Sequence, residues 1–170
     1  IFMIDVSFFK ANRQDVTVTF ADIKTVRIGD NLRRVPGILS AEMIRDVPVT
    51  LRYGSRKKRL SLTGVEPGDD LQQLLNISLE PTTVPDIGIA LSEKVASILD
   101  AGIGDVIQVE RADKRRRTFQ MPVTSILQGY IGLAAYVDLT ELNKQTGDGR
   151  VITAVNLKVD RGKEAELYRT

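Results

Sequence analysis

The segment from Asp86 to Glu110 constrains the fold of this chain more than any other, because it predicts a strand, a capped helix, a glycine turn and a second strand in succession. Up to Leu91, apolar residues alternate with small or polar ones, which is the period of a half-buried strand. Ser92 then offers a hydroxyl to the free amides of a helix start. An apolar stripe follows at helical spacing, formed by Val95, Ile98 and Leu99.

Two glycines, Gly102 and Gly104, come directly after this stripe, where a left-handed residue usually ends a helix. A glycine loop that cradles phosphate instead precedes its helix, so that the amides of the helix start face the anion. The order of the residues therefore predicts a helix stop and a turn rather than a nucleotide site.

The chain contains neither cysteine nor histidine. It therefore has no disulfide, no thiol nucleophile, no histidine-based triad and none of the usual zinc ligand sets. Its 24 basic and 22 acidic residues give a net charge of +2, which argues against a dedicated nucleic-acid-binding protein. No run of residues approaches the roughly twenty apolar residues of a membrane span. These features predict a globular domain with no catalytic residue, no cofactor and no metal of its own.

The first 14 residues have apolar side chains on more than one side of a helix. Two interpretations remain open for a helix of this kind. It is either a buried terminal helix or a juxtamembrane helical stalk that continues a hydrophobic element upstream. The predicted domain boundary at residue 14 corresponds to the end of such a stalk.

The rest of the chain predicts an α+β fold in two parts. A strand at 15–20, a helix at 22–34 and a long strand at 41–53 form one β-α-β unit, and a strand at 151–159 begins another that continues into a helix. Together, residues 15–53 and 151–170 indicate a split, ferredoxin-like α/β part. Residues 54–150 are then an inserted β-rich subdomain.

Within the insertion, the pattern predicts a strand at 60–65 that closes a β-hairpin with the long strand. It also predicts a helix started by Asp69, a hairpin from Glu110 to Val123, a strand at 128–137 and a short helix capped by Thr140.

Two hairpins carry clusters of basic residues. The first cluster is Arg56, Lys57, Lys58 and Arg59, and the second is Arg111, Lys114, Arg115, Arg116 and Arg117. One interpretation is a pair of solvated hairpin tips that keep sheet edges soluble. The other is a face for an anionic partner such as lipid headgroups or an acidic protein. Nucleic acid is the least favoured partner, because no row of aromatic residues interleaves the charges.

Two aromatic residues, Tyr130 and Tyr136, lie among small residues in GYIGLAAY. Packing in the core is their expected role, and the alternative is a groove that receives cargo or a partner subunit. The closest acidic groupings are Asp69 with Asp70 and Glu42 with Asp46. A helix start and a strand account for these pairs better than a catalytic or metal site, and the loop GDGR at 147–150 is expected to be a turn.

A series of motifs in this order resembles the extracytoplasmic core domain of permease subunits in the MacB/FtsX-like group of ABC transporters. The matching motifs are RQDVTVTF at 13–20, VPGI at 35–38, RDVPVTLRYG at 45–54, LTGVEPG at 62–68, GIALSEKVASIL at 88–99, GD at 104–105 and YIGLAAYVDLTELN at 130–143. No single motif is specific, but the series covers nearly the whole chain.

This resemblance implies a periplasmic or extracellular domain held between transmembrane helices of an inner-membrane protein. ATP would be hydrolysed by a separate cytoplasmic subunit, and the motion would drive the movement, export or release of a substrate outside the membrane. The implied partners are that ATPase subunit, a second permease copy or paralogue, and an extracytoplasmic adaptor or carrier protein. The alternative is a free-standing periplasmic binding module with a basic, anion-binding face, and a carboxylate-based hydrolase is a residual possibility.

Overall fold

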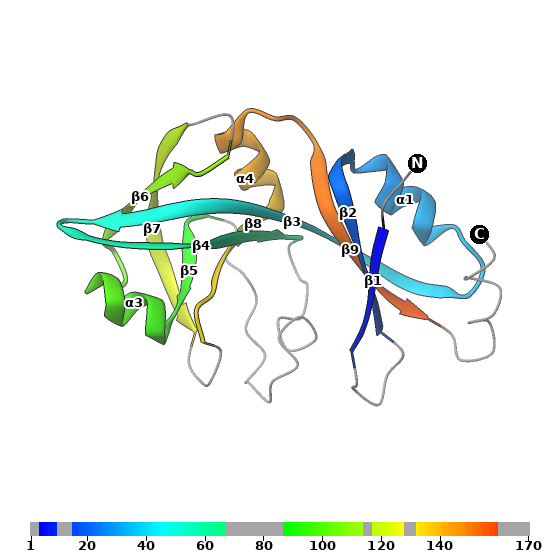
Figure 1. Ribbon diagram of the computed structural model, residues 1–170, viewed down its shortest axis with the longest axis horizontal. Helices are drawn as coiled ribbons and strands as arrows, with labels where there is room; N and C mark the ends of the chain where they lie inside the picture. The colour runs from blue at the N-terminus through cyan, green and yellow to red at the C-terminus, as the bar shows by residue number, and fades with distance from the viewer. Residues whose placement is uncertain (1–3, 10–14, 67–86, 114–116, 128–131, 160–170) are drawn as a thin grey trace. The chain divides into compact units, whose positions relative to one another are not determined.

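The computed structural model describes residues 4–9, 15–66, 87–113, 117–127 and 132–159 (Figure 1). The chain divides into two compact units. The first unit comprises Ile1–Arg45 and Arg150–Thr170, and the second, called the barrel unit below, comprises Asp46–Gly149. Within the described ranges, no helix has the length and hydropathy needed to cross a membrane.

The first unit contains an antiparallel sheet with the strand order β1-β2-β9-β3. Its elements are β1 (Ile4–Phe9), β2 (Asp15–Thr25), α1 (Arg27–Arg33), the first half of β3 (Ile38–Tyr53) and β9 (Val151–Val159). Strands β2 and β3 both pair antiparallel with β9, one on each side of it, and α1 connects them. This is the split β-α-β arrangement that the sequence predicted. The helix expected after Val159 lies outside the described residues.

The prediction of a helix at the N-terminus is wrong for Ile4–Phe9, which form strand β1. This strand pairs with β2 over its whole length, from Ile4 opposite Phe20 to Phe9 opposite Asp15. Its sequence IDVSFF is rich in β-branched and aromatic residues, which favour strands. The same apolar residues that suggested a helix exposed on several sides also satisfy the two-residue period of a strand.

The helix predicted from Asp22 also begins later than expected, at Arg27. Strand β2 has an irregularity opposite β9 between Thr19 and Lys24, and then pairs again with Ile152 and Val151. The hydrogen bonds to β9 therefore keep residues 22–25 extended, and this tertiary pairing overrides the local helical pattern.

The barrel unit contains six strands that close on themselves. Its strands are the second half of β3, β4 (Arg56–Val65), β5 (Ile89–Ser92), β6 (Val106–Arg111), β7 (Thr118–Leu127) and β8 (Ala135–Asp138). The order is β3-β4-β8-β5-β7-β6, and β6 pairs with β3 from Val49 opposite Arg111 to Arg52 opposite Gln108. The pairs β4–β8 and β5–β7 are parallel. Closure leaves these strands without free edges.

The barrel encloses the main hydrophobic core. Side chains from all six strands meet there, including the fully buried Leu51, Leu62, Leu91 and Ile107. Helix α3 (Glu93–Leu99) contributes Val95 and Leu99, and helix α4 (Leu139–Thr146) contributes Leu142. The predicted return strand also has the expected face, since Phe119, Met121 and Val123 are all buried in this core.

Helix α3 begins where the sequence predicted, because the Ser92 hydroxyl accepts a hydrogen bond from the Val95 amide at 3.4 Å. Its end differs from the prediction: Asp100, with a φ of 54°, takes the left-handed position in place of a glycine. Aspartate tolerates this conformation better than most residues with a side chain. Gly104 has a φ of 94° in the turn that follows, before β6 begins at Val106.

Helix α4 is capped by Asp138 rather than by the predicted Thr140. The Asp138 carboxylate accepts a hydrogen bond from the Glu141 amide at 3.0 Å. The strand predicted at 128–137 is observed in part, as β8 (Ala135–Asp138). The helix predicted from Asp69 lies outside the described residues.

Candidate functional site

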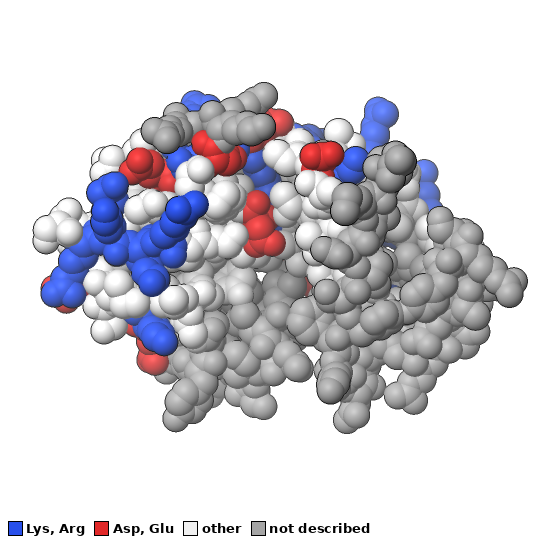
Figure 2. Space-filling view, viewed as in Figure 1, with Lys and Arg blue, Asp and Glu red and all other residues white. Residues whose placement is uncertain are grey.

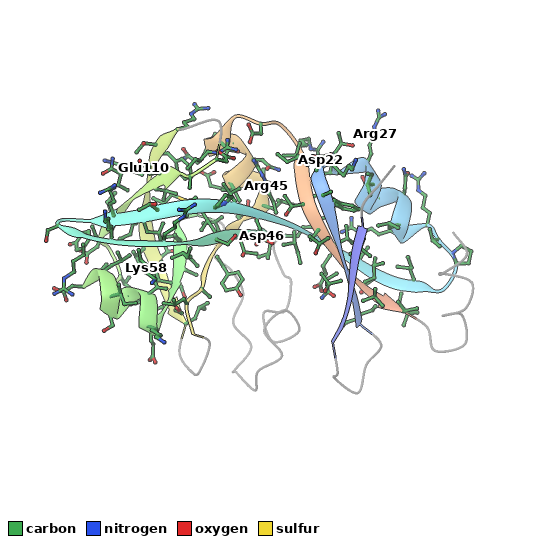
Figure 3. All side chains as sticks on the ribbon, in the orientation of Figure 1. Asp22, Arg27, Arg45, Asp46, Lys58 and Glu110 are labelled. Atoms are coloured by element: carbon green, nitrogen blue, oxygen red, sulfur yellow. The ribbon has the colours of Figure 1, made fainter. Side chains whose placement is uncertain are left out.

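The first basic cluster lies on the hairpin formed by β3 and β4, which are joined through Gly54 and Ser55. Successive residues of a strand point to opposite faces, so the four basic residues divide into two pairs. Lys57 and Arg59 are exposed and belong to the outer face of the barrel wall. Arg56 and Lys58 belong to the face that carries Leu62 into the core. Figure 2 shows lysine and arginine side chains gathered over this hairpin, and Figure 3 labels Lys58 there.

The two faces of this hairpin have different surroundings. The Arg56 guanidinium donates a hydrogen bond to the Ile98 carbonyl at 3.4 Å, near the C-terminal end of α3. On the outer face, Arg52 Nε lies 2.9 Å from Glu110 Oε2, and both side chains are about two-fifths exposed. We call Lys57 and Arg59 the outer basic pair.

The second basic cluster is not a single surface. The Arg111 side chain is only 2% exposed and forms ion pairs with Asp113 and with Asp148, the latter through Nη1 at 2.9 Å. Burial by itself lowers the pKa of Arg111, but the hydrogen bonds and charges of the two carboxylates more than offset this and raise the pKa. Arg111 is therefore charged and engaged within the protein. Arg117 is exposed, and Lys114, Arg115 and Arg116 lie outside the described residues.

The Arg111 ion pairs also explain the loop GDGR. Asp148 in this loop is 6% exposed at its side chain and holds Arg111, so the loop is a turn whose carboxylate already has a cationic partner. Gly147 ends α4 with a φ of 70°. Sequence reasoning missed this pairing because nothing in the local spacing connects the loop to the distant strand β6.

Tyr136 is 8% exposed and packs in a small cluster with Val65, Ala90 and Leu127. Burial, assisted by the negative charge of Asp46, raises the pKa of Tyr136 to about 12. The Asp46 carboxylate accepts a hydrogen bond from the Thr63 hydroxyl at 2.7 Å. Burial raises the pKa of Asp46, and this hydrogen bond opposes that shift.

Five other residues or members of pairs were singled out from the sequence. Tyr130, Asp69 and Asp70 lie outside the described residues. Glu42 and Asp46 belong to different units. In the part of the chain that the structure describes, no group of three or more acidic side chains is arranged to hold a metal ion.

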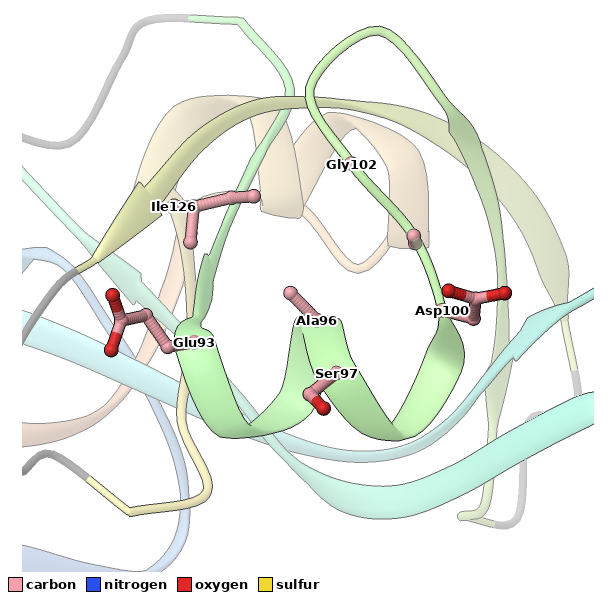
Figure 4. A pocket seen from close by; sticks show the side chains of 7 residues that line it. Glu93, Ala96, Ser97, Asp100, Gly102 and Ile126 are labelled. Carbon is pink, nitrogen blue, oxygen red and sulfur yellow. The ribbon is translucent and has the colours of Figure 1, made fainter.

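A groove of about 510 Å³ lies along α3 (Figure 4) and was not predicted from sequence. Its lining residues are Glu93, Ala96, Ser97, Asp100, Ala101, Gly102 and Ile126. Three of them, Glu93, Ala96 and Ser97, follow the spacing i, i+3 and i+4 on α3, which places them on one face of the helix, and the C-cap residue Asp100 follows at i+7. This spacing is visible in the sequence and could have predicted a second face on the helix. Only the buried apolar stripe on the opposite side was considered from the sequence.

Comparison with known proteins identifies the fold. No protein-family model and no curated protein sequence matches the chain. Among solved structures, the extracellular domain of the noncanonical ABC-type transporter YknZ from Gram-positive bacteria matches with a TM-score of 0.63 and 17% identity, over 85% of this chain and 78% of that one. The periplasmic region of MacB from Actinobacillus actinomycetemcomitans matches with a TM-score of 0.60 and 12% identity, over 85% of this chain and 69% of that one. The chain therefore has the fold of these two extracytoplasmic domains, as the resemblance of its sequence motifs predicted.

Proposed function

We propose that this chain is the extracytoplasmic domain of an ABC transporter permease of the FtsX/MacB type. The observation that carries this proposal is the structural match to the YknZ extracellular domain, which extends over 85% of the chain and includes both compact units. The order of the sequence motifs supports the same assignment and does not depend on the structure.

In this role the domain transmits motion and recognises partners, and it performs no chemistry of its own. ATP hydrolysis takes place in a separate cytoplasmic subunit and is coupled to the export, movement or release of a substrate outside the membrane. The chain then works with that ATPase, with a second permease copy or paralogue, and with an extracytoplasmic adaptor or carrier. Membrane helices outside this sequence anchor it in the inner membrane, with the domain in the periplasm or its equivalent.

The two units suit a division of labour within such a domain. We assign the first unit to a porter-like part, because it contains the split β-α-β sheet and the chain of the barrel unit is inserted between its two segments. The barrel unit corresponds to the inserted subdomain. In its closed sheet each strand pairs with a neighbour on both sides, so the subdomain has no free strand edge within the barrel.

A second candidate function is a free-standing periplasmic module that binds an anionic partner. The outer basic pair, Lys57 and Arg59, supports this alternative, because both side chains are exposed on the same face of β4. Both functions are compatible with partner binding at this hairpin.

Cell fractionation with an antibody to the 170-residue chain separates the two functions. The permease assignment predicts recovery in the membrane fraction, as part of a chain much larger than 18.8 kDa. It also predicts that protease added to intact spheroplasts removes the epitope. A soluble antigen of about 18.8 kDa would overturn the permease assignment and favour the binding module.

A further inference from the structure

Three large aliphatic side chains on the barrel unit are at least half exposed: Ile87 (70%), Ile103 (69%) and Val106 (50%). All three lie beside the same short stretch of β7. The Thr124 hydroxyl donates a hydrogen bond to the Ile87 carbonyl at 2.9 Å. Pro122 is the cross-strand partner of Val106. The amide of Gly104, which directly follows Ile103, donates to the Val123 carbonyl at 2.9 Å. The backbones of the three exposed residues therefore lie beside one short stretch of β7, and exposed apolar residues grouped in this way are typical of interaction sites.

The turn that presents Ile103 is held in place by the surrounding backbone. The Gly102 amide donates to the Asp105 carboxylate at 2.7 Å, and the Asp105 amide donates back to the Gly102 carbonyl at 3.1 Å. Gly104 supplies the left-handed conformation that the turn requires, with a φ of 94°. Ile103 is thus exposed by a fixed turn rather than by a frayed loop, and a partner would not have to order it on binding.

The groove along α3 adjoins this group of exposed residues. Gly102 lines the groove and immediately precedes Ile103, and the apolar residues of the lining are Ala96, Ala101 and Ile126. Figure 4 shows Ala96 on the helix and Ile126 on the strand that faces it. Small residues in the lining leave room for inserted side chains. The polar residues of the lining are Glu93, Ser97 and Asp100, and among the described lining residues there is no lysine or arginine.

The two carboxylates of the lining have a defined spacing. Glu93 begins α3 and Asp100 is its C-cap residue, so the two are seven residues or about two turns apart, which corresponds to about 10 Å along the helix axis. Apolar residues of the lining separate them. A complementary ligand therefore carries two positive charges about 10 Å apart with apolar groups between them.

We propose that this surface, formed by Ile87, Ile103, Val106 and the α3 groove, binds a basic amphipathic helical segment of another protein. A helix with the pattern Lys-x-x-Leu-Leu-x-x-Lys places its two lysines on one face at the required spacing and its leucines between them. The lysines pair with Glu93 and Asp100, and the leucines pack against Ala96, Ile126 and Ile103. The surface is a property of the barrel unit and is independent of the transport role proposed above.

A designed peptide provides the test. A fluorescently labelled helical peptide built from two repeats of that pattern is titrated with the 170-residue chain, and binding is followed by anisotropy. Two control peptides accompany it: one with glutamate in place of each lysine, and one with the same composition but leucines distributed around the helix. We expect the designed peptide to bind, and both controls to bind at least tenfold more weakly.

Variants of the chain locate the binding site. Asp100→Asn keeps a residue that tolerates the left-handed conformation and removes only the charge, and we expect it and Glu93→Gln to weaken binding about threefold each. We expect Ile103→Ser to weaken binding by about tenfold, because it removes a large apolar contact. The matched controls are Glu110→Gln, an exposed acid outside the groove, and Leu39→Ser, a residue of the first unit with 71% exposure. Both controls should bind as the parent chain does.

Several results would overturn the proposal. One is equal affinity for the lysine and glutamate peptides. Another is a loss of binding in Leu39→Ser or Glu110→Gln as large as in Ile103→Ser or Asp100→Asn, measured on variants with an unchanged melting temperature. Self-association of the chain that disappears in Ile103→Ser, without any peptide binding, would also overturn it and would assign the surface to a second copy of the chain.

Discussion

The two basic hairpins of the barrel unit have similar sequences but different physical roles. On the β3–β4 hairpin, Lys57 and Arg59 point to solvent, where a charge contributes little to stability. On the β6–β7 hairpin, Arg111 is buried and held by the carboxylates of Asp113 and Asp148. The difference arises because Arg111 belongs to the inward face of a closed barrel, where its charge requires partners. A run of basic residues therefore identifies neither a binding surface nor a structural ion pair until the direction of each side chain is known.

Removal of the buried Arg111 should change the free energy of unfolding more than any other substitution considered for the two hairpins. We expect Arg111→Ala to lower the free energy of unfolding by about 3–5 kcal/mol, because it removes the guanidinium that lies 2.9 Å from the buried carboxylate of Asp148. Urea unfolding followed by circular dichroism measures the change, and Arg59→Ala provides the exposed control. A double variant, Arg111→Met with Asp148→Leu, should recover most of the loss. Equal stability of Arg111→Ala and Arg59→Ala would contradict the distinction between the hairpins.

Neutralisation of one buried carboxylate should have a smaller effect than loss of the arginine. We expect Asp148→Asn to destabilise the chain by about 2 kcal/mol, since the amide keeps the shape and part of the hydrogen-bonding capacity but loses the charge that stabilises Arg111. Asp113→Asn should cost less, because its side chain is 30% exposed and water can replace it. The same unfolding measurement ranks the two carboxylates. A larger loss for Asp113→Asn would show that the more exposed carboxylate is the principal partner of Arg111.

The sequence predicted local features of the fold well. The start of α3 at Ser92, the hairpin between β3 and β4, and the buried face of β7 all depend on residues close together in the chain, whose spacing is visible in the sequence. Prediction failed where distant segments decide the outcome. The pairing of β6 with β3 closes the barrel, and pairing with β9 keeps residues 22–25 extended.

The candidate sites also divide into features that nearby residues determine and features that depend on distant segments of the chain. The exposure of Lys57 was predictable from its place in a hairpin. The burial of Arg111 was not, because its partner Asp148 belongs to a loop after α4, far along the chain. The groove on α3 had a visible helical spacing, but its lining includes Ile126 from β7, which only the folded structure brings to the helix.

Substitution of the glycine next to Asp148 tests how the loop geometry supports the buried pair. Gly147 has a φ of 70°, and a methyl group there would also contact the guanidinium of Arg117. We expect Gly147→Ala to destabilise the chain by about 1 kcal/mol, mainly through the left-handed backbone. The combination with Arg117→Ala should not restore stability, because Arg117 is exposed and can move aside. Thermal unfolding compares the single and double variants. Full recovery in the double variant would instead make the contact with Arg117 the cause.

Removal of the outer basic pair should leave stability nearly unchanged and alter only binding. We expect Lys57→Ala with Arg59→Ala to change the free energy of unfolding by less than about 0.5 kcal/mol, as for other exposed side chains. The same variant should elute from a heparin column at lower salt, because the pair concentrates positive charge on one hairpin. The matched control is Arg27→Ala with Arg34→Ala, which removes two exposed charges from the first unit. If both variants shift equally, retention depends on net charge alone. A larger shift for the hairpin variant would instead assign anion binding to the outer face of β4, where the strand presents both side chains to solvent, whereas β6 turns Arg111 inward to its carboxylate partners.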